Sequence, residues 1–201
     1  MSQATKVLSI NGSYRDNGIT DQAIKTAAQS LAESGAVVES IMLREYPIEF
    51  CLNCRACTQE PGVTPGHCVH DDSMRELVEK IEEADAYIIA APTNLGSVTA
   101  IFKRFMERLV VYAYWPWGAP GPRYRKAKLP KKKAMLISSC AAPGLMGRWL
   151  YGTQKQLRMT AQMIGAAPVG TVFAGMIAGE ADAAYPERMR RKAEVLAKKL
   201  L

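Results

Sequence analysis

Four of the five cysteines fall within eighteen residues, at Cys51, Cys54, Cys57 and Cys68. Gaps of two, two and ten residues let thiolates converge on one centre, as they do in iron–sulfur and zinc sites. The residues leave three alternatives open. The segment holds a [4Fe–4S] cluster, or a structural zinc ion with His67 or His70 as a further ligand, or free or redox-active thiols in a reducing compartment.

A loop rich in small and polar residues follows the first apolar run of the chain. The segment Asn11-Gly-Ser-Tyr-Arg-Asp-Asn-Gly-Ile-Thr20 combines two hydroxyl groups, one guanidinium and the expected amino terminus of a helix. These groups together can bind a phosphate. The loop is neither a GxGxxG motif nor a nucleotide P-loop, because it lacks the lysine. An ordinary turn in which Thr20 caps the helix is the alternative.

Two further loops have a composition that suits a flat ligand. Ala91-Pro-Thr-Asn-Leu-Gly-Ser97 offers exposed backbone and polar side chains, which can recognise the edge of a heteroaromatic ring. Ser138-Ser-Cys-Ala-Ala-Pro-Gly144 offers small residues, which permit close approach either of a planar ligand or of a packed helix. Neither loop decides between a ligand and a plain turn by itself.

The elements that position these loops alternate between strand and helix. Apolar runs predict strands at 6–11, 37–43, 87–91, 134–139 and 169–176, with Pro168 suited to an edge strand. Helical periodicity predicts helices at 20–31, 74–81, 98–109, 149–164 and 186–200. This order predicts an α/β sandwich with a doubly wound parallel sheet. In such a sheet ligands bind beyond the carboxyl ends of the strands, where all three loops begin.

Composition and charge narrow the class of protein. The chain has 201 residues, of which 48% are hydrophobic and 22% charged, which indicates one globular domain. It has no run of eighteen apolar residues and no signal-type segment, so we expect a cytoplasmic protein without a membrane span. The formal net charge is +7, and eleven basic residues but no acidic ones lie between Glu107 and Glu180.

This basic block favours a docking surface for a phosphorylated cofactor or an acidic redox partner, and it makes nucleic acid a weaker interpretation. The block includes an aromatic run, Val111 to Pro122. That run either packs against its own domain or closes over the ligand pocket.

The segments together resemble the NAD(P)H-dependent FMN reductases and iron–sulfur flavoproteins over nearly the whole chain. Asn11-Gly-Ser-Tyr-Arg…Thr20 is similar to their phosphate loop. Pro92-Thr-Asn-Leu-Gly-Ser with Ile101-Phe-Lys-Arg-Phe is similar to their flavin-ring loop and dimer-forming helix. The cysteine segment resembles their compact cluster motif, whose last gap is shorter, and equally the cysteine-bearing loop of relatives that hold no cluster.

The resemblance implies a flavodoxin-like three-layer sandwich with strand order 2-1-3-4-5, noncovalent FMN, and homodimers or homotetramers. It implies that Ser13, Arg15, Gly18, Ile19 and Thr20 hold the phosphate, and that Pro92, Thr93, Asn94, Leu95 and Gly96 line the isoalloxazine ring. Cys140, Ala141 and Gly144 would lie near the other edge of the ring. Gly18 and Ile19 replace the family's usual Ser and Asn, and Asn94 and Leu95 stand where an aromatic residue is common in the family.

The implied function is an FMN-dependent oxidoreductase that passes electrons from NAD(P)H through flavin to a quinone, a flavin, or another small-molecule or protein acceptor. The alternative is a flavodoxin-like or iron–sulfur flavoprotein electron carrier without its own small-molecule substrate. No catalytic side chain is predicted, because the cofactor carries the redox chemistry. We expect residues 1–201 to form one FMN-binding domain, with a cysteine-rich insertion at about 45–70 and an aromatic/basic loop at about 111–133.

Overall fold

The computed structural model describes residues 4–143, 150–176 and 184–201. Its main sheet contains five parallel strands in the order β2-β1-β3-β6-β7. The strands are β1 (Lys6–Asn11), β2 (Val37–Met42), β3 (Ala86–Pro92), β6 (Lys132–Ser139) and β7 (Ala166–Ala174). The predicted flavodoxin-like α/β fold and its 2-1-3-4-5 strand order are therefore confirmed, with β6 and β7 as the fourth and fifth strands of the sheet.

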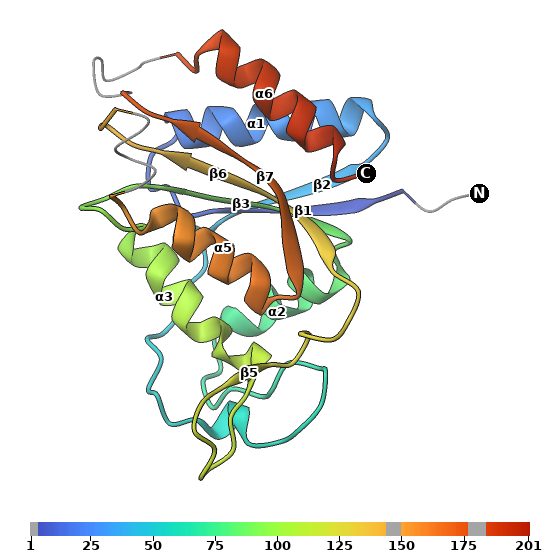
Figure 1. Ribbon diagram of the computed structural model, residues 1–201, viewed down its shortest axis with the longest axis vertical. Coiled ribbons are helices and arrows are strands. Elements are labelled where there is room, and N and C mark those ends of the chain that lie inside the picture. The colour runs from blue at the N-terminus through green and yellow to red at the C-terminus, as the bar shows by residue number, and fades with distance from the viewer. Residues whose placement is uncertain (1–3, 144–149, 177–183) are drawn as a thin grey trace.

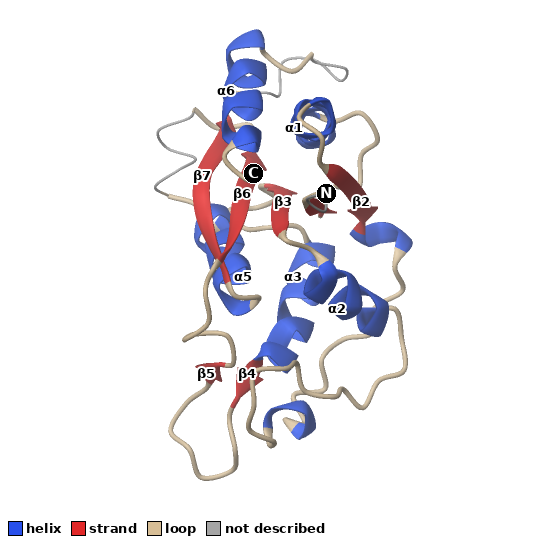
Figure 2. Ribbon diagram, turned by 90° about the vertical axis from the view of Figure 1, so that its right-hand side faces the viewer, coloured by secondary structure: helices blue, strands red, loops and turns tan. Residues whose placement is uncertain are grey.

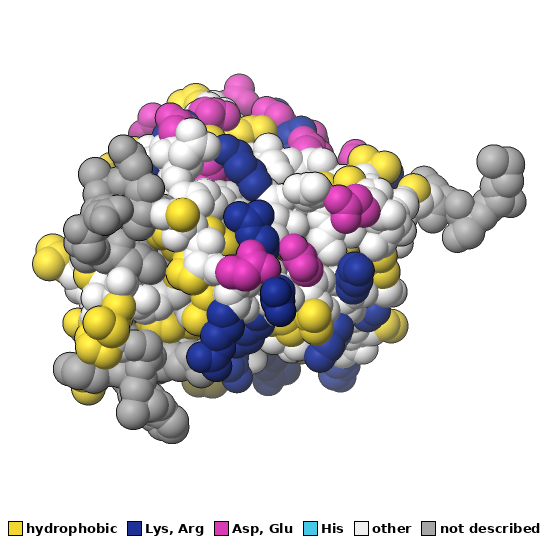
Figure 3. All heavy atoms as spheres, turned by 90° about the horizontal axis from the view of Figure 1, so that it is seen from above, with side chains coloured by type: hydrophobic (Ala, Val, Ile, Leu, Met, Phe, Trp, Pro, Cys, Tyr) yellow, Lys and Arg dark blue, Asp and Glu magenta, His cyan; other side chains and the backbone are white. Residues whose placement is uncertain are grey.

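Helices cover both faces of this sheet. They are α1 (Ile19–Glu33), α2 (Met74–Glu83), α3 (Ala100–Arg108), α5 (Thr153–Met163) and α6 (Glu187–Lys198). Helices α1 and α6 lie on one face, and α2, α3 and α5 lie on the other (Figures 1 and 2). Figure 3 looks onto the α1–α6 side, where basic and acidic side chains occur together.

The buried core alternates along each strand, as a sheet covered on both faces requires. In β3, Tyr87 and Ile89 pack in the α2–α3–α5 layer, whereas Ile88 and Ala90 pack in the α1–α6 layer. Pro168 lies in the edge strand β7, as expected, beside a register shift between Ala134 and Met135 of β6. An edge strand tolerates proline because one side of it donates to no neighbour.

Helix α3 starts two residues later than the periodicity predicts. Thr99 caps it, and the Thr99 hydroxyl accepts a hydrogen bond of 3.3 Å from the amide of Phe102. The same hydroxyl donates to the carbonyl of Gly12 at 2.6 Å. The cap therefore fixes the start of α3 against the loop that follows β1.

A smaller structural unit extends from the end of α3. This unit contains two short 3-10 helices, at Ala56–Thr58 and Leu109–Tyr112, and the hairpin of β4 (Ala113–Tyr114) with β5 (Arg123–Tyr124). A further 3-10 helix, Leu43–Glu45, directly follows β2. The hairpin and the cysteine segment (residues 45–70) lie at the bottom of Figure 1, away from the carboxyl ends of the sheet strands at the left. The hairpin was not predicted from the sequence.

Candidate functional site

The three loops identified in the sequence leave the sheet side by side. Backbone hydrogen bonds continue past the strand ends, from Gly12 to Ala90 at 2.8 Å and from Thr93 to Ser139 at 2.7 Å. A third bond runs from the amide of Cys140 to the carbonyl of Ala174 at 2.8 Å. The chain leaves β1 for β2 on one side and later returns to β3 on the other, so the winding reverses here. Ligands of doubly wound sheets bind at this position.

The first loop, residues 11–20, is folded by its own hydroxyl and amide groups. The amide of Ser13 donates to Oδ1 of Asn11 at 2.9 Å, and the amide of Arg15 donates to Oγ of Ser13 at 3.2 Å. Gly18 is the N-cap residue of α1 and supplies no capping side chain. Arg15 is exposed beside this helix start. The arrangement presents backbone donors, the positive end of a helix dipole and a guanidinium together.

Thr20 does not cap the helix, contrary to the alternative interpretation of this loop. Its hydroxyl lies 2.8 Å from the hydroxyl of Ser139, and both residues are buried. Because a hydroxyl has one donor and two acceptor sites, Thr20 retains bonding capacity toward a ligand. The bond ties the first loop to the strand that leads into the third.

Gly12 is required by packing against Phe102 of α3, a contact that the sequence does not reveal. A Cβ at this position would lie 2.7 Å from Cδ2 of Phe102, closer than real side-chain atoms come. The glycine therefore allows α3 to pack against the first loop.

The second loop, residues 91–97, is a tight turn with an exposed tip. Asn94 and Ser97 bond reciprocally through their backbones at 2.8 and 3.0 Å, with Leu95 (φ 46°) and Gly96 (φ 79°) between them. A left-handed conformation is unfavourable for a leucine, and this side chain is fully exposed. An apolar side chain held in this way suits contact with a bound ring.

A side chain of α5 supports the second loop. Oε1 of Gln156 accepts from the hydroxyl of Ser97 at 3.0 Å and from the amide of Val98 at 3.1 Å. Sequence reasoning missed Gln156, since nothing in its local pattern distinguishes it from other polar residues of α5.

The hydroxyl oxygen Oγ1 of Thr93, in the same loop, is buried and has no hydrogen-bond partner among the described residues. A buried, unpaired hydroxyl at this position matches a site that a polar ligand would complete.

The third loop begins at Cys140, which is buried, and continues to Ala141, which is exposed. The amide of Ala142 donates to the Cys140 sulfur at 3.3 Å, and the amide of Met176 donates to the carbonyl of Ala142 at 3.1 Å. Gly144 lies outside the described residues. Cys140 and Ala141 thus share the end of the sheet with the first two loops.

The four clustered cysteines line one small cavity. Cys51, Cys54, Cys57 and Cys68 all contribute to its wall, together with Arg55, Arg108 and Trp115. Burial, together with the nearby thiols of Cys68, Cys51 and Cys54, raises the pKa of Cys57 to about 11. The thiols therefore face a common space.

The thiols do not come together as a metal site in this arrangement. In the parts of the chain that the structure describes, no three His, Cys, Asp or Glu side chains form a group that could hold a metal ion. The donor set suits iron–sulfur or zinc chemistry, but its present geometry does not fit a bound ion. The four-cysteine metal site therefore stays a prediction, as do zinc and free thiols.

One buried ion pair and several carbonyl contacts hold the cysteine segment. Arg108 is 1% exposed and binds both carboxylate oxygens of Asp72, at 2.6 and 3.0 Å. It also donates to the carbonyl of Glu49 at 2.8 Å and to the sulfur of Cys68 at 3.4 Å. Burial lowers the pKa of Arg108, but Asp72 and the Cys68 thiol outweigh that effect and raise it above its ordinary value. Arg108 therefore joins the two ends of the segment.

Arg125 and Gly66 complete this packing. The Arg125 guanidinium donates to the carbonyls of Cys57 at 3.1 Å, Glu60 at 2.8 Å and Val111 at 3.0 Å. A Cβ on Gly66 would lie 1.8 Å from the carbonyl oxygen of Cys57, so only glycine fits where the segment crosses itself. The interior of this unit thus includes a buried arginine that binds backbone carbonyls.

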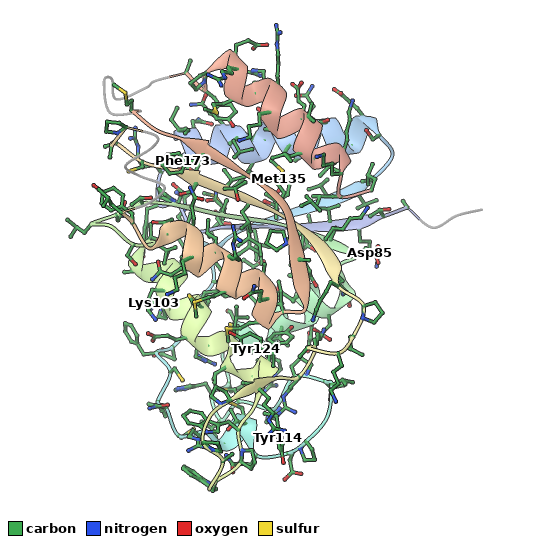
Figure 4. The ribbon with its side chains drawn as sticks, in the orientation of Figure 1. Asp85, Lys103, Tyr114, Tyr124, Met135 and Phe173 are labelled. Atoms are coloured by element: carbon green, nitrogen blue, oxygen red, sulfur yellow. The ribbon has the colours of Figure 1, made fainter. Side chains whose placement is uncertain are left out.

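The aromatic run packs against the cysteine segment of its own chain. The Arg55 guanidinium lies between two rings, 3.7 Å from the centroid of Trp115 and 4.3 Å from that of Trp117. In Figure 4, Tyr114 lies at the bottom of the molecule, whereas Phe173 lies near the strand ends. Within this chain, the run is therefore not positioned to close over the three loops.

Three cations of the basic block are used inside the protein. Arg108, Arg125 and Lys126 are each 8% exposed or less. Nζ of Lys126 contacts both carboxylate oxygens of Glu82, at 2.5 and 2.7 Å. These three cations support the smaller unit from inside, whereas Arg123, Lys128, Lys131 and Lys133 are exposed. The docking surface for a phosphorylated cofactor or an acidic redox partner therefore stays a prediction.

Comparison with known proteins identifies the family. Residues 5–178 match the family described as NADPH-dependent FMN reductase. The chain belongs to this family. Within the described ranges, no helix is long and apolar enough to cross a bilayer.

Individual relatives add detail. An iron–sulfur flavoprotein of Archaeoglobus fulgidus is 34% identical over 111 residues, which cover 55% of this chain and 48% of that protein. The chain therefore spans about half the length of this relative. The solved structure of the NAD(P)H:quinone oxidoreductase from Methanothermobacter marburgensis aligns with 98% of this chain and 97% of its own, at a TM-score of 0.68 and 16% identity.

A second solved structure is the FMN-dependent NADH-azoreductase of Bacillus anthracis in complex with FMN. It aligns with 98% of this chain and 99% of its own, at a TM-score of 0.65 and 14% identity. At these identities the structural likenesses show the shared fold alone.

Proposed function

We propose that this protein is an FMN-dependent oxidoreductase that takes electrons from NAD(P)H and passes them to a quinone, a flavin, or another small-molecule or protein acceptor. The observation that carries the proposal is the convergence of three loops at the winding reversal of the sheet, in a chain of the NADPH-dependent FMN reductase family. We also propose that the whole chain is one FMN-binding domain, with the cysteine segment and the aromatic/basic loop as insertions, and that it forms homodimers or homotetramers.

The residues of the first loop suit a phosphate. In the proposed site Ser13, Arg15 and Thr20 supply side-chain donors, and Gly18 and Ile19 supply backbone at the start of α1. Charge-assisted hydrogen bonds from a guanidinium and the helix dipole both stabilise an anion. Asp21 in the first turn opposes this effect, but its carboxylate is engaged by the amide of Asn17 at 2.9 Å and by Lys25 at 3.1 Å.

The residues of the other loops suit a flat ring. Pro92, Thr93, Asn94, Leu95 and Gly96 would line one side of it, and Thr93 would use its unpaired hydroxyl. Cys140, Ala141 and Gly144 would lie near the other edge. When bound, FMN supplies the hydride-accepting and electron-donating chemistry. The side chains of this protein bind the cofactor, orient it and keep its phosphate at the helix start.

The test is a titration with FMN followed by turnover. We expect the protein to bind FMN stoichiometrically and then to oxidise NADPH or NADH when a quinone such as 1,4-benzoquinone is supplied. Without an added acceptor and under anaerobic conditions, oxidation should stop after one equivalent of NAD(P)H per bound FMN, because one hydride reduces the flavin fully. A protein that takes up no FMN would contradict the proposal.

The second candidate is an electron carrier without its own substrate, and the four thiols that face one cavity favour it. Such a carrier would bind FMN and be reduced by dithionite, but it would not oxidise NAD(P)H with any acceptor. Iron, sulfide and zinc analysis of anaerobically purified protein separates the three alternatives for the cysteines. Four iron and four sulfide per chain indicate a cluster, one zinc indicates a structural ion, and neither indicates free thiols.

A further inference from the structure

A cavity of about 370 Å³ lies between α2 and residues 65–70, apart from the three-loop site. Its apolar lining includes Met74, Val78 and Val111. Small-molecule sites in proteins have volumes of about 300–1,000 Å³ and are mostly apolar with a few polar groups. The proposed flavin site makes no use of this cavity.

Arg108, one of the residues that line the cavity, has an unused hydrogen-bond donor. Arg108 lines the cavity and is 1% exposed, and its two terminal nitrogens are taken by Asp72, Glu49 and Cys68. Its remaining donor, Nε, is buried and has no partner within the described part of the chain. A buried donor without an acceptor is unfavourable, and a ligand oxygen placed against it would remove that cost.

Charges at the rim restrict the kind of ligand. Glu79 and Glu83 are exposed there, and Arg75 is paired with Asp71 at 3.1 Å. Glu82 is already neutralised, because Lys126 binds its carboxylate. The rim is therefore acidic on balance and repels carboxylates and phosphates. A dinucleotide does not suit this cavity, whereas an uncharged molecule does.

We propose that this cavity binds an uncharged, largely apolar small molecule whose carbonyl oxygen accepts a hydrogen bond from Nε of Arg108. The site borders the cysteine segment directly, because Cys68, His70 and Arg108 line both this cavity and the one that the four thiols share. A bound molecule would lie beside the Cys68 sulfur. The inference does not depend on flavin binding.

The experiment compares two probes of nearly equal shape by equilibrium dialysis against the full-length protein. The first is 1-tetralone, a bicyclic aromatic ketone, and the second is tetralin, the same ring system without the carbonyl oxygen. We expect saturable one-site binding of 1-tetralone and binding of tetralin that is roughly tenfold weaker or more, the range of one hydrogen bond to a charged donor.

Two variants locate the site. Val78→Trp places an indole in the cavity from a half-buried position of α2, and it should abolish binding of both probes. Val195→Trp, at an exposed position of α6, is the matched control and should bind both probes as the parent protein does. Circular dichroism and thermal unfolding verify that each variant is folded.

A third variant tests the donor. Arg108→Lys keeps a cation beside Asp72 but lacks Nε, so it should weaken 1-tetralone roughly tenfold and leave tetralin unchanged. Absence of 1-tetralone binding, equal binding by Val78→Trp, or equal affinity of the parent protein for the two probes would each overturn the proposal. The parent and Val78→Trp measurements decide it even where Arg108→Lys fails to fold.

Discussion

The hydroxyl groups of Thr20 and Ser139, 119 residues apart in the sequence, share a buried hydrogen bond of 2.8 Å. This bond joins the start of α1 to the carboxyl end of β6. Replacing Thr20 by Val keeps the shape of the side chain but leaves the Ser139 hydroxyl buried without its partner. We expect Thr20→Val to lower the free energy of unfolding by about 1–3 kcal/mol, measured by urea denaturation.

The double variant Thr20→Val/Ser139→Ala tests the pairing itself. Removing both hydroxyls leaves none unpaired, so its loss should be smaller than the sum of the two single losses by about 1 kcal/mol. Thr26→Val is the matched control, because the Thr26 hydroxyl bonds only to the Gln22 carbonyl within α1. Additive losses for Thr20 and Ser139 would show that the two hydroxyls are not coupled.

The Arg15 guanidinium is expected to contribute directly to FMN affinity. Arg15→Ala should weaken FMN binding by about 1.5–3 kcal/mol, the range for a hydrogen bond to a charged group, as measured by quenching of flavin fluorescence. Arg191→Ala is a suitable control, since Arg191 is paired with Glu187 on α6. An unchanged FMN titration for Arg15→Ala would remove this residue from the phosphate site.

Leu95 combines backbone strain with an exposed apolar side chain, so its replacement should separate stability from binding. Leu95→Gly relieves the positive φ and should raise the free energy of unfolding of the cofactor-free protein by up to about 1 kcal/mol. The same change removes the side chain from the ring site and should weaken FMN. Thermal unfolding and an FMN titration measure the two effects.

Gly35→Ala should change the free energy of unfolding in the opposite direction to Leu95→Gly, because it adds a side chain at a similar positive φ. Gly35 has φ 85° and open space around it, so added strain is the only expected effect. This variant should lose stability and keep its FMN affinity. Tighter FMN binding by Leu95→Gly would show that the leucine does not contact the ring.

The Arg108–Asp72 pair should make stability depend on acidic pH. Burial raises the pKa of Asp72, but the hydrogen bonds from Arg108 and from the amides of Glu49 and Met74 outweigh it, so the folded pKa lies below the ordinary 3.8. The stabilisation is therefore complete above pH 3.8 and is lost as the pH falls through the lower folded value.

Asp72→Asn removes the charge and leaves Arg108 buried without a counterion, which should cost about 3–5 kcal/mol near neutral pH. The difference in the free energy of unfolding between Asp72→Asn and the parent protein should shrink as urea denaturation is repeated from pH 5 down toward pH 3. Asp71→Asn is the control, because Asp71 is exposed and its pair with Arg75 lies at the surface. A difference that stays constant with pH would contradict the assignment.

The sequence was sufficient for the parts of the fold that depend on local periodicity. Strand β1 was predicted with its observed bounds, and the order of strands and helices followed from alternating patterns. The positions of Ser13, Thr93 and Cys140 at strand ends followed from the same reasoning, because parallel strands end at one edge of the sheet. The short β4–β5 hairpin could not be predicted, since two-residue strands have no periodicity.

Contacts between residues far apart in the sequence could not be predicted either. The basic residues from Arg123 to Lys133 suggested a docking surface, because nothing local indicates that Arg125 binds backbone carbonyls or that Lys126 pairs with Glu82. Gly12 and Gln156 were likewise beyond local patterns. Their roles depend on Phe102 and Ser97, which come close only after the chain has folded.

The way in which arginines hold the cysteine segment has a consequence for its dynamics. Arg125 binds carbonyl oxygens, the amide of Trp115 donates to the carbonyl of Thr58 at 2.9 Å, and the amide of Gly66 donates to that of Val111 at 2.8 Å. None of these three contacts involves sulfur, whereas the hydrogen bond from Arg108 to the Cys68 sulfur does. The segment should therefore open together with residues 109–115 as one cooperative unit, and the amides of Trp115 and Gly66 should remain protected from hydrogen exchange after all the thiols are blocked.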